Sequence, residues 1–113
     1  MFQTRHNLRI RIEQQSDRTA VLLNGRLDSH GATVFKQSLS QALGGGPACI
    51  DVDLSGVTSV DGMGLASLVW AWRSAASTGC ELRVVRMRTQ VREIAERMNL
   101  HLLMRITEGP RPA

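Results

Sequence analysis

The stretch Ile50-Asp51-Val52-Asp53-Leu54 places the strongest constraint on what this chain can fold into. Apolar and acidic residues alternate in it, which is typical of a β-strand with one buried face and one polar face. A sheet covered by helices on both faces would bury Asp51 and Asp53 side by side. The alternation therefore predicts a sheet that carries helices on one face only and is open to water on the other.

Neighbouring segments are predicted to complete that sheet. Residues 8–13 and 82–84 alternate apolar and charged side chains as half-buried strands do, and residues 19–27 are more apolar. The polar residues 14–18 between the first two segments predict an antiparallel hairpin. The basic residues expected to pair with the two aspartates across strands of the open face are Arg9, Arg11 and Arg83.

Three amphipathic segments are predicted to cover the other face. Asp28 or Ser29 can cap a first helix, which Gly44-Gly45-Gly46-Pro47 would stop. A second helix is expected over 65–78, and Thr89 can cap a third. The inward stripe of the second helix is expected to consist of Leu65, Leu68, Val69, Trp72 and Ala76.

The whole pattern predicts one α/β domain. The chain has 113 residues, which leaves no room for two independent cores. Residues 1–107 are assigned to the domain, with a mixed sheet of four to five strands, the fifth a short edge strand over 102–106. Residues 108–113 are expected to form a flexible tail. No stretch approaches the roughly 18 apolar residues of a membrane span and no signal-peptide core precedes the domain, so a cytoplasmic location without membrane insertion is expected.

The net charge leaves the class of partner open at first. The 14 Lys and Arg residues exceed the 10 Asp and Glu residues, giving a formal charge of +4. Such a surplus is compatible with nucleic-acid binding. However, a charge-paired sheet face would absorb much of it, and no stripe of aromatic and basic residues is present. We therefore expect an acidic protein partner and no nucleic acid.

Catalytic and metal chemistry find little support in the residues. His6, His30 and His101 are scattered, without the i, i+4 spacing of a helical metal pair. Cys49 and Cys80 lie 31 positions apart, outside any metal or redox motif. We expect no catalytic residue, no metal and no cofactor.

The junction Val60-Asp61-Gly62-Met63-Gly64-Leu65 is more informative, since a strand leads there directly into a helix. Asp61 can accept hydrogen bonds from the first free N–H groups of that helix. A helix N-terminus at the surface favours anions and phosphorylated side chains. By itself, this pattern predicts only a capped helix.

The segment Asp53–Leu65 closely resembles the signature of STAS domains of the anti-sigma factor antagonist type, which reads D-L-S, a few residues, and then D-S-S/T-G-L. Gly25-Arg26-Leu27-Asp28 resembles the G-x-L-D of that family, at the same place before the first helix. The order of elements matches over roughly residues 8–107. The resemblance implies a non-enzymatic bacterial protein that docks on a serine-kinase-like anti-sigma factor, which phosphorylates the first serine of the motif.

This sequence departs from the family pattern at that serine. The phosphoacceptor position is Gly62, which has no hydroxyl group, and Met63 follows it. Phosphorylation at the usual site is therefore impossible. Thr58 and Ser59 are the candidate substitute phosphoacceptors. We expect the protein to bind its partner without this off-switch, or to be regulated through the state of the partner.

Met63 and Trp70 stand seven residues apart and are predicted to share a helical stripe with Ser67 and Ser74, away from the core stripe. Two large apolar side chains there could anchor a partner. The alternative is that Trp70 packs against a neighbouring helix. The residues expected to contact the partner are Asp28, Ser29, His30, Ser59, Asp61, Gly62, Met63 and Trp70.

Two function classes follow. The first is a regulatory interaction module in signalling and transcription regulation that works by partner switching. Such a module is expected to be a monomer or a weak homodimer. The second is the STAS regulatory subunit of a phospholipid-trafficking ABC transporter complex. A third reading, nucleotide or small-ligand binding at the same turn, lacks a dedicated phosphate loop.

Overall fold

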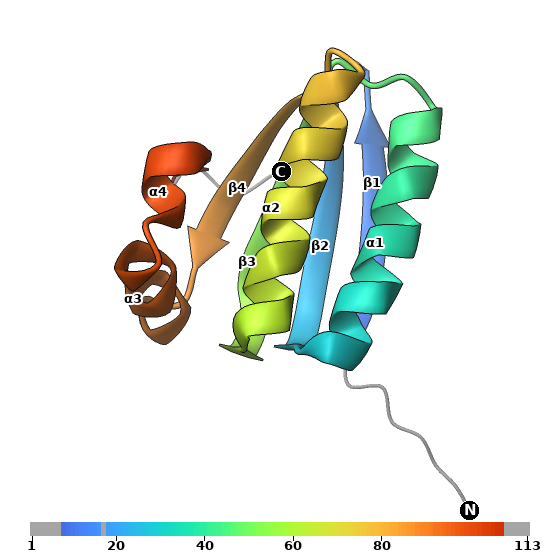
Figure 1. The fold of residues 1–113 in the computed structure, drawn as a ribbon. Coiled ribbons are helices and arrows are strands. Elements are labelled where there is room, and N and C mark those ends of the chain that lie inside the picture. Colours follow the sequence, from blue (N-terminus) through green and yellow to red (C-terminus); the bar gives the residue numbers. More distant parts are fainter. Residues whose placement is uncertain (1–7, 17, 108–113) are drawn as a thin grey trace, which may run out of the picture.

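The computed structural model describes residues 8–16 and 18–107, which form one five-stranded mixed sheet with helices on one face (Figure 1). The strands lie in the order β1-β2-β3-β4-β5, with β1 antiparallel to β2 and the other neighbours parallel. The predicted α/β class and the single layer of helices are confirmed. The elements are β1 (Leu8–Gln15), β2 (Arg18–Leu27), α1 (Ser29–Gly44), β3 (Cys49–Val60), α2 (Gly62–Ser77), β4 (Glu81–Met87), α3 (Thr89–Arg97), α4 (Leu100–Leu103) and β5 (Arg105–Thr107).

Helices α1 and α2 lie side by side across one face of the sheet, and α3 and α4 lie beyond them next to β4 (Figure 1). Phe35 and Leu39 of α1 and Leu68 of α2 are fully buried between helices and sheet. Because α1 and α2 each connect two parallel strands, both helices begin at the same end of the sheet (Figure 1). This topology brings the turn after β2 and the turn after β3 together.

The predicted inward stripe of α2 is only partly right. Leu65 and Leu68 are buried, but Ala76 is exposed, and Val69 and Trp72 are half-buried. The buried stripe continues instead through small residues of α2 that allow the helix to approach its neighbours closely. Its members are Gly64, Leu65, Ser67, Leu68, Ala71 and Ala75.

Ser67 is a second correction on α2, because we predicted it on an outward stripe. The residue is fully buried, and its hydroxyl donates a 2.6 Å hydrogen bond to the carbonyl oxygen of Gly64. Since α2 packs against α1 as well as the sheet, its buried surface extends around the flank that carries Ser67. This bond satisfies the buried hydroxyl within its own helix.

The two aspartates of β3 are on the face without helices, as predicted, but they are largely shielded from water. The side chains of Asp51 and Asp53 are only 12% and 2% exposed because arginines cover them. Asp51 accepts hydrogen bonds from Arg83 at 2.9 Å and from Arg18 at 2.7 Å. Asp53 pairs with Arg86.

The prediction that Arg83 pairs with Asp51 is thus confirmed. The prediction for Arg9 and Arg11 is wrong, because within residues 8–16 and 18–107 neither arginine forms an ion pair with Asp51 or Asp53. Arg11 pairs with Glu13 of its own strand at 3.2 Å. Strand β2 lies between β1 and β3, so an arginine on β1 would have to reach over a whole strand to meet the aspartates. The pattern of alternation could not reveal this strand order.

The C-terminal segment differs most from expectation. Residues 102–106 were predicted as an edge strand, but α4 occupies 100–103 and the edge strand is confined to 105–107. The cap of α3 is Arg88, not Thr89, and it makes no side-chain capping bond. The tail predicted over 108–113 lies outside the described residues. Among the helices of the described ranges, none is both long enough and apolar enough to cross a membrane.

Candidate functional site

The end of the sheet at which α1 and α2 begin gathers most of the predicted site. Asp28 caps α1 and accepts a 2.9 Å hydrogen bond from the backbone N–H of Gly31. Asp61 caps α2 in the same manner, accepting a 2.9 Å bond from the backbone N–H of Gly64. Both predicted caps are confirmed. The hydrogen bond from Gly31 also lowers the pKa of the Asp28 carboxyl, since it stabilises the ionised form.

The two helix starts are held against each other by the end of β2. Leu27 is paired with Val60 across the parallel strands, and its carbonyl oxygen accepts a 3.4 Å bond from the backbone N–H of Asp61. A Cβ added to Gly64 would lie only 1.8 Å from that same carbonyl oxygen. A glycine at position 64 is therefore needed for the close approach of α2 to β2.

Gly62 is under no such constraint. A Cβ added to Gly62 would meet nothing within 4 Å, and its backbone does not adopt a positive φ angle. The fold thus tolerates a side chain at this position. The glycine at position 62 is therefore not a steric requirement of the fold.

The surface around the two caps consists of exposed residues on both sides. Ser29 and His30 are exposed in the first turn of α1, and Met63 is 56% exposed in the first turn of α2. Thr58 and Ser59 are exposed at the end of β3. We call residues 28–30 and 58–63 the helix-start surface. It unites every predicted contact residue except Trp70.

Trp70 lies two turns along α2, about 10 Å from Met63 along the helix axis. It is half-buried against the core, and the ammonium group of Lys36 on α1 lies 5.6 Å from the centroid of its ring. This distance is within the range of a cation–π interaction. The alternative reading, in which Trp70 packs at the boundary with a neighbouring helix, matches these contacts better than a free anchor does.

Thr58, one of the two candidate phosphoacceptors, has its hydroxyl engaged in the fold. It donates a 3.3 Å hydrogen bond to the carbonyl oxygen of Gly25, a residue with φ of +116° on β2. Sequence reasoning missed this contact, as it missed the role of the Leu27 carbonyl. The Gly25–Asp28 motif is the sequence signal that could have indicated both contacts. A glycine followed so closely by a helix cap marks a strand that turns tightly into a helix.

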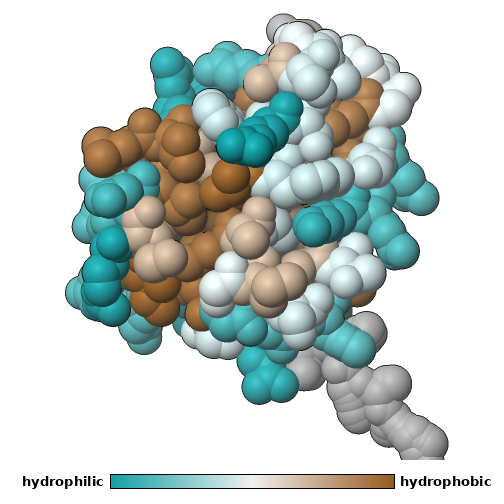
Figure 2. Space-filling view, viewed as in Figure 1, coloured by the Kyte–Doolittle hydropathy of each residue, from teal (hydrophilic) through white to brown (hydrophobic). Residues whose placement is uncertain are grey.

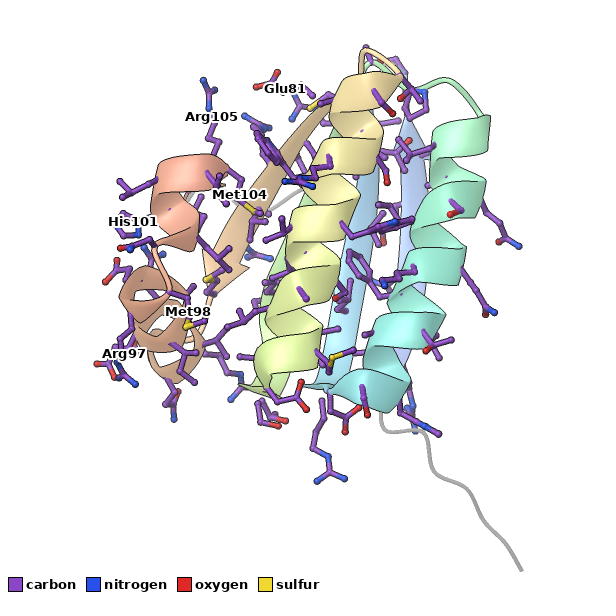
Figure 3. All side chains as sticks on the ribbon, in the orientation of Figure 1. Glu81, Arg97, Met98, His101, Met104 and Arg105 are labelled. Carbon is purple, nitrogen blue, oxygen red and sulfur yellow. The ribbon has the colours of Figure 1, made fainter. Side chains whose placement is uncertain are left out.

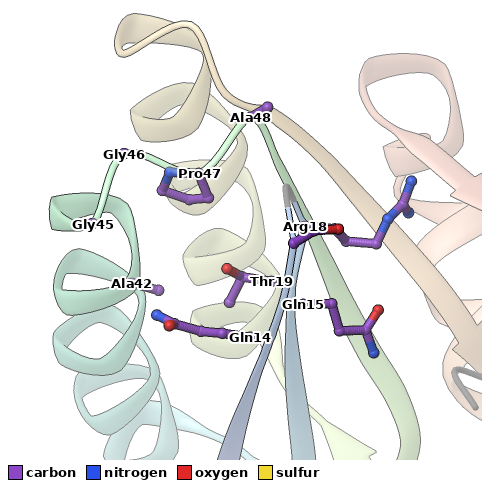
Figure 4. Close-up of a pocket in the computed structure, with 10 residues that line it drawn as sticks. Gln14, Gln15, Arg18, Thr19, Ala42, Gly45, Gly46, Pro47 and Ala48 are labelled. Atoms are coloured by element: carbon purple, nitrogen blue, oxygen red, sulfur yellow. The ribbon is translucent and has the colours of Figure 1, made fainter.

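Residues elsewhere in the described ranges do not form a metal site, since no group of three or more His, Cys, Asp or Glu side chains converges there. A cavity of about 280 Å³ opens where the β1–β2 turn meets the end of α1 (Figure 4). Gln14 and Thr19 point into it beneath Pro47, while Arg18 points away over the opposite face of the sheet (Figure 4). It lies far from the helix-start surface, and no predicted site residue lines it.

A family model described as Mlab, STAS domain, matches residues 10–105. The chain belongs to this STAS family. Among solved structures, it is similar to an anti-sigma factor antagonist from Mycobacterium paratuberculosis, at 18% identity and a TM-score of 0.81, with 90% of this chain and 86% of that chain covered. A putative anti-sigma factor antagonist from Thermotoga maritima gives 24% identity and a TM-score of 0.81, with 88% and 86% covered.

RsbS from Moorella thermoacetica is similar at 22% identity and a TM-score of 0.75, with 91% of this chain and 88% of that chain covered. These likenesses show that the STAS fold extends over nearly the whole described domain. The predicted resemblance to STAS domains is thereby confirmed.

Proposed function

We propose that this STAS domain is a non-enzymatic regulatory module that binds a serine-kinase-like anti-sigma factor through the helix-start surface. The observation that carries the proposal is the joint presentation of two capped helix starts, held together through Leu27, with Met63 exposed between polar neighbours. Exposed apolar side chains within a polar surround are typical of docking surfaces.

Regulation in this proposal does not pass through position 62. A phosphate on a helix start would add charge and bulk to the docking surface, but Gly62 cannot carry one. Binding is therefore constitutive at this end of the molecule or set by the nucleotide state of the partner. Stoichiometric phosphate on Thr58 or Ser59 after incubation with the cognate kinase, with loss of binding, would contradict this part.

A second candidate is the STAS regulatory subunit of a phospholipid-trafficking ABC transporter complex. The name Mlab in the matching family model favours it, since the transporter-associated branch also uses small stand-alone STAS domains. The two candidates share the docking surface and differ in the partner. A soluble protein with a histidine-kinase fold is expected for the first, and an ATPase with a membrane permease for the second.

Capture from the native cell separates these candidates. The wild-type chain serves as bait beside Met63→Ala, which removes an exposed side chain of the helix-start surface, and Ile12→Ala, a matched control on β1 that is 37% exposed. We expect Met63→Ala to lose most of the captured partner at an unchanged melting temperature, while Ile12→Ala retains it. Equal capture by both variants would refute the assignment of the surface.

A further inference from the structure

The cavity between the β1–β2 hairpin and the end of α1 has no role in the proposed function. Its volume is about 280 Å³, just below the range of roughly 300–1,000 Å³ that is typical of ligand pockets. Helix α1 begins at the helix-start surface and ends at this cavity, so its 16 residues separate the two places by about 24 Å. We call it the hairpin cavity. The residues that line it include Gln14, Thr19, Ala42, Gly45, Gly46 and Pro47.

Thr19 places a buried hydroxyl group in the hairpin cavity. The residue is only 4% exposed, and its side chain points into the cavity beneath Pro47 (Figure 4). Within residues 8–16 and 18–107, its hydroxyl group forms no hydrogen bond with another residue. Buried polar groups nearly always have a partner, and a buried hydroxyl without one costs free energy. The cavity therefore presents a polar group that a bound molecule can satisfy.

Gln14 adds a second polar group to the same cavity. It lies directly opposite Thr19 in the antiparallel register of β1 and β2, and its side chain also points into the cavity (Figure 4). Its carboxamide can donate and accept hydrogen bonds, and no described residue is hydrogen-bonded to it. Ala42 and Pro47 provide apolar walls beside these groups. Convergent polar groups within apolar walls are typical of small-molecule sites.

The electrostatics of the cavity favour a neutral ligand. Arg18 is the only charged residue among the described residues that line it, and its guanidinium pairs with Asp51 at 2.7 Å on the opposite face of the sheet. The C-terminal end of α1 carries a partial negative charge, which disfavours anions and favours hydrogen-bond donors. A cation finds no carboxylate among the same lining residues.

The described surroundings of the cavity add no charge to it. Figure 2 shows mostly pale residues of intermediate hydropathy where α1 ends, in contrast to the apolar area over α3 and α4. Glu81 and Arg105 lie on the β4 side of α2, away from α1, and pair with each other at 3.5 Å (Figure 3). The hairpin cavity is therefore a neutral space with free hydrogen-bonding groups.

From the buried hydroxyl, the carboxamide and the neutral lining, we propose that the hairpin cavity binds a small neutral molecule with several hydroxyl groups, a monosaccharide or a cyclic polyol. The hydroxyl groups of the ligand exchange hydrogen bonds with Thr19 and Gln14, and its C–H face packs against Pro47 and Ala42. The small volume fits a single ring. Because the site lies at the other end of α1 from the helix-start surface, the inference does not depend on the proposed function.

A titration of the isotope-labelled full-length protein, followed through its amide chemical shifts, tests the proposal. The neutral probes are D-glucose and myo-inositol, each up to about 50 mM, a range that includes weak binding. Sodium phosphate and choline chloride, at constant ionic strength, are the charged controls. We expect at least one neutral probe to shift the amides of Thr19, Gly45 and Gly46 saturably, with a Kd below about 10 mM. Neither charged probe should do so.

Two variants and a matched control locate the binding. Thr19→Val removes the hydroxyl group but keeps the shape of the side chain, and Gln14→Ala removes the carboxamide, so each should weaken binding at least about fivefold. Gln15→Ala alters the same residue type one position along, where the side chain points away from the cavity, and should retain the affinity of the wild type (Figure 4). The melting temperature of Thr19→Val should be unchanged or higher, because the buried hydroxyl has no partner in the fold.

Three results overturn the proposal. The first is a titration in which neither neutral probe shifts the cavity amides saturably. The second is phosphate binding at these amides that is tighter than the binding of both neutral probes. The third is an affinity that both Thr19→Val and Gln14→Ala leave unchanged.

Discussion

Two pairs of aspartates in this domain have opposite environments. Asp51 and Asp53 are buried under arginines in the middle of the sheet, while Asp28 and Asp61 cap helices just after the ends of β2 and β3, among exposed neighbours. The first pair contributes to stability through ion pairs that are largely shielded from water. The second pair fixes the start of each helix, and the neighbouring side chains, where we propose that a partner docks, stay exposed. The stabilising pair and the proposed docking surface are thus separated along the same two strands, β2 and β3.

The largest expected loss of stability comes from a substitution at the start of α2. Gly64→Ala places a Cβ 1.8 Å from the carbonyl oxygen of Leu27, so the backbone of α2 or β2 must move. We expect a loss of more than about 4 kcal/mol in the free energy of unfolding, or no folded protein. Gly62→Ala, two residues away and facing open space, is the control and should change stability by less than about 0.5 kcal/mol. Similar urea midpoints for the two variants would show that the close approach is absent.

Removing a buried carboxylate is expected to rank second. Asp53→Ala leaves the guanidinium of Arg86 without its partner in a buried environment. Breaking such a pair costs about 3–5 kcal/mol, whereas Asp61→Ala, which removes only a helix cap, should cost about 1 kcal/mol. Denaturant unfolding of both variants measures the difference. An Asp61→Ala variant that is the less stable of the two would break the comparison.

Acid unfolding gives a third test of the same contrast. Burial alone would raise the pKa of Asp51 and of Asp53, but hydrogen bonds from Arg83 and Arg18 to the first, and from Arg86 to the second, outweigh it and hold each pKa below its usual value.

A carboxyl with a lowered folded pKa contributes stability above its unfolded pKa of about 3.9, and this contribution disappears as the pH falls through the folded value. We therefore expect the melting temperature to be flat from neutral pH to about pH 5 and to fall steeply below about pH 4. Asp51→Asn should start less stable at neutral pH and show a shallower fall in acid. An identical acid slope for wild type and variant would contradict the assignment.

The smallest expected effect concerns Trp70, two turns along α2 from Met63. Its ring packs at the edge of the core and beneath Lys36, so Trp70→Ala should lower the free energy of unfolding by about 1–2 kcal/mol, less than for a fully buried tryptophan. Lys36→Met removes the cation but keeps the packing and should cost less than about 1 kcal/mol. Lost partner binding at an unchanged melting temperature would instead make Trp70 an anchor of the docking surface.

Most of the fold could be predicted because β3 alternates so clearly. Ile50, Val52 and Leu54 face the helices, and the intervening aspartates therefore had to lie on the other face. The caps at Asp28 and Asp61 were predictable for a similar reason, since capping depends on residues three positions apart. Local patterns of this kind persist in the folded chain.

What the sequence could not reveal depends on contacts between distant residues. Arg18 and Arg86 cover the aspartates. Predicting these contacts requires knowledge of the strand order and of the bulge at Arg86, where φ is +54°. The burial of Ser67 depends on the packing of α1 against α2. The exposed Leu102 and Leu103 were read as strand residues because a four-residue helix is too short to show a period.

The central claim is that the helix-start surface docks a partner and that Gly62 merely lacks the group that would switch it off. The most direct measurement is the affinity of the co-purified partner for wild type and for Gly62→Asp, by calorimetry or biolayer interferometry. The added carboxylate has space around it and stands at a helix N-terminus, where negative charge is favourable, so the melting temperature should be unchanged or slightly higher. The account predicts that Gly62→Asp binds at least about tenfold more weakly, as a permanent negative charge should act at this surface. Full affinity in a folded Gly62→Asp variant would show that the partner binds elsewhere.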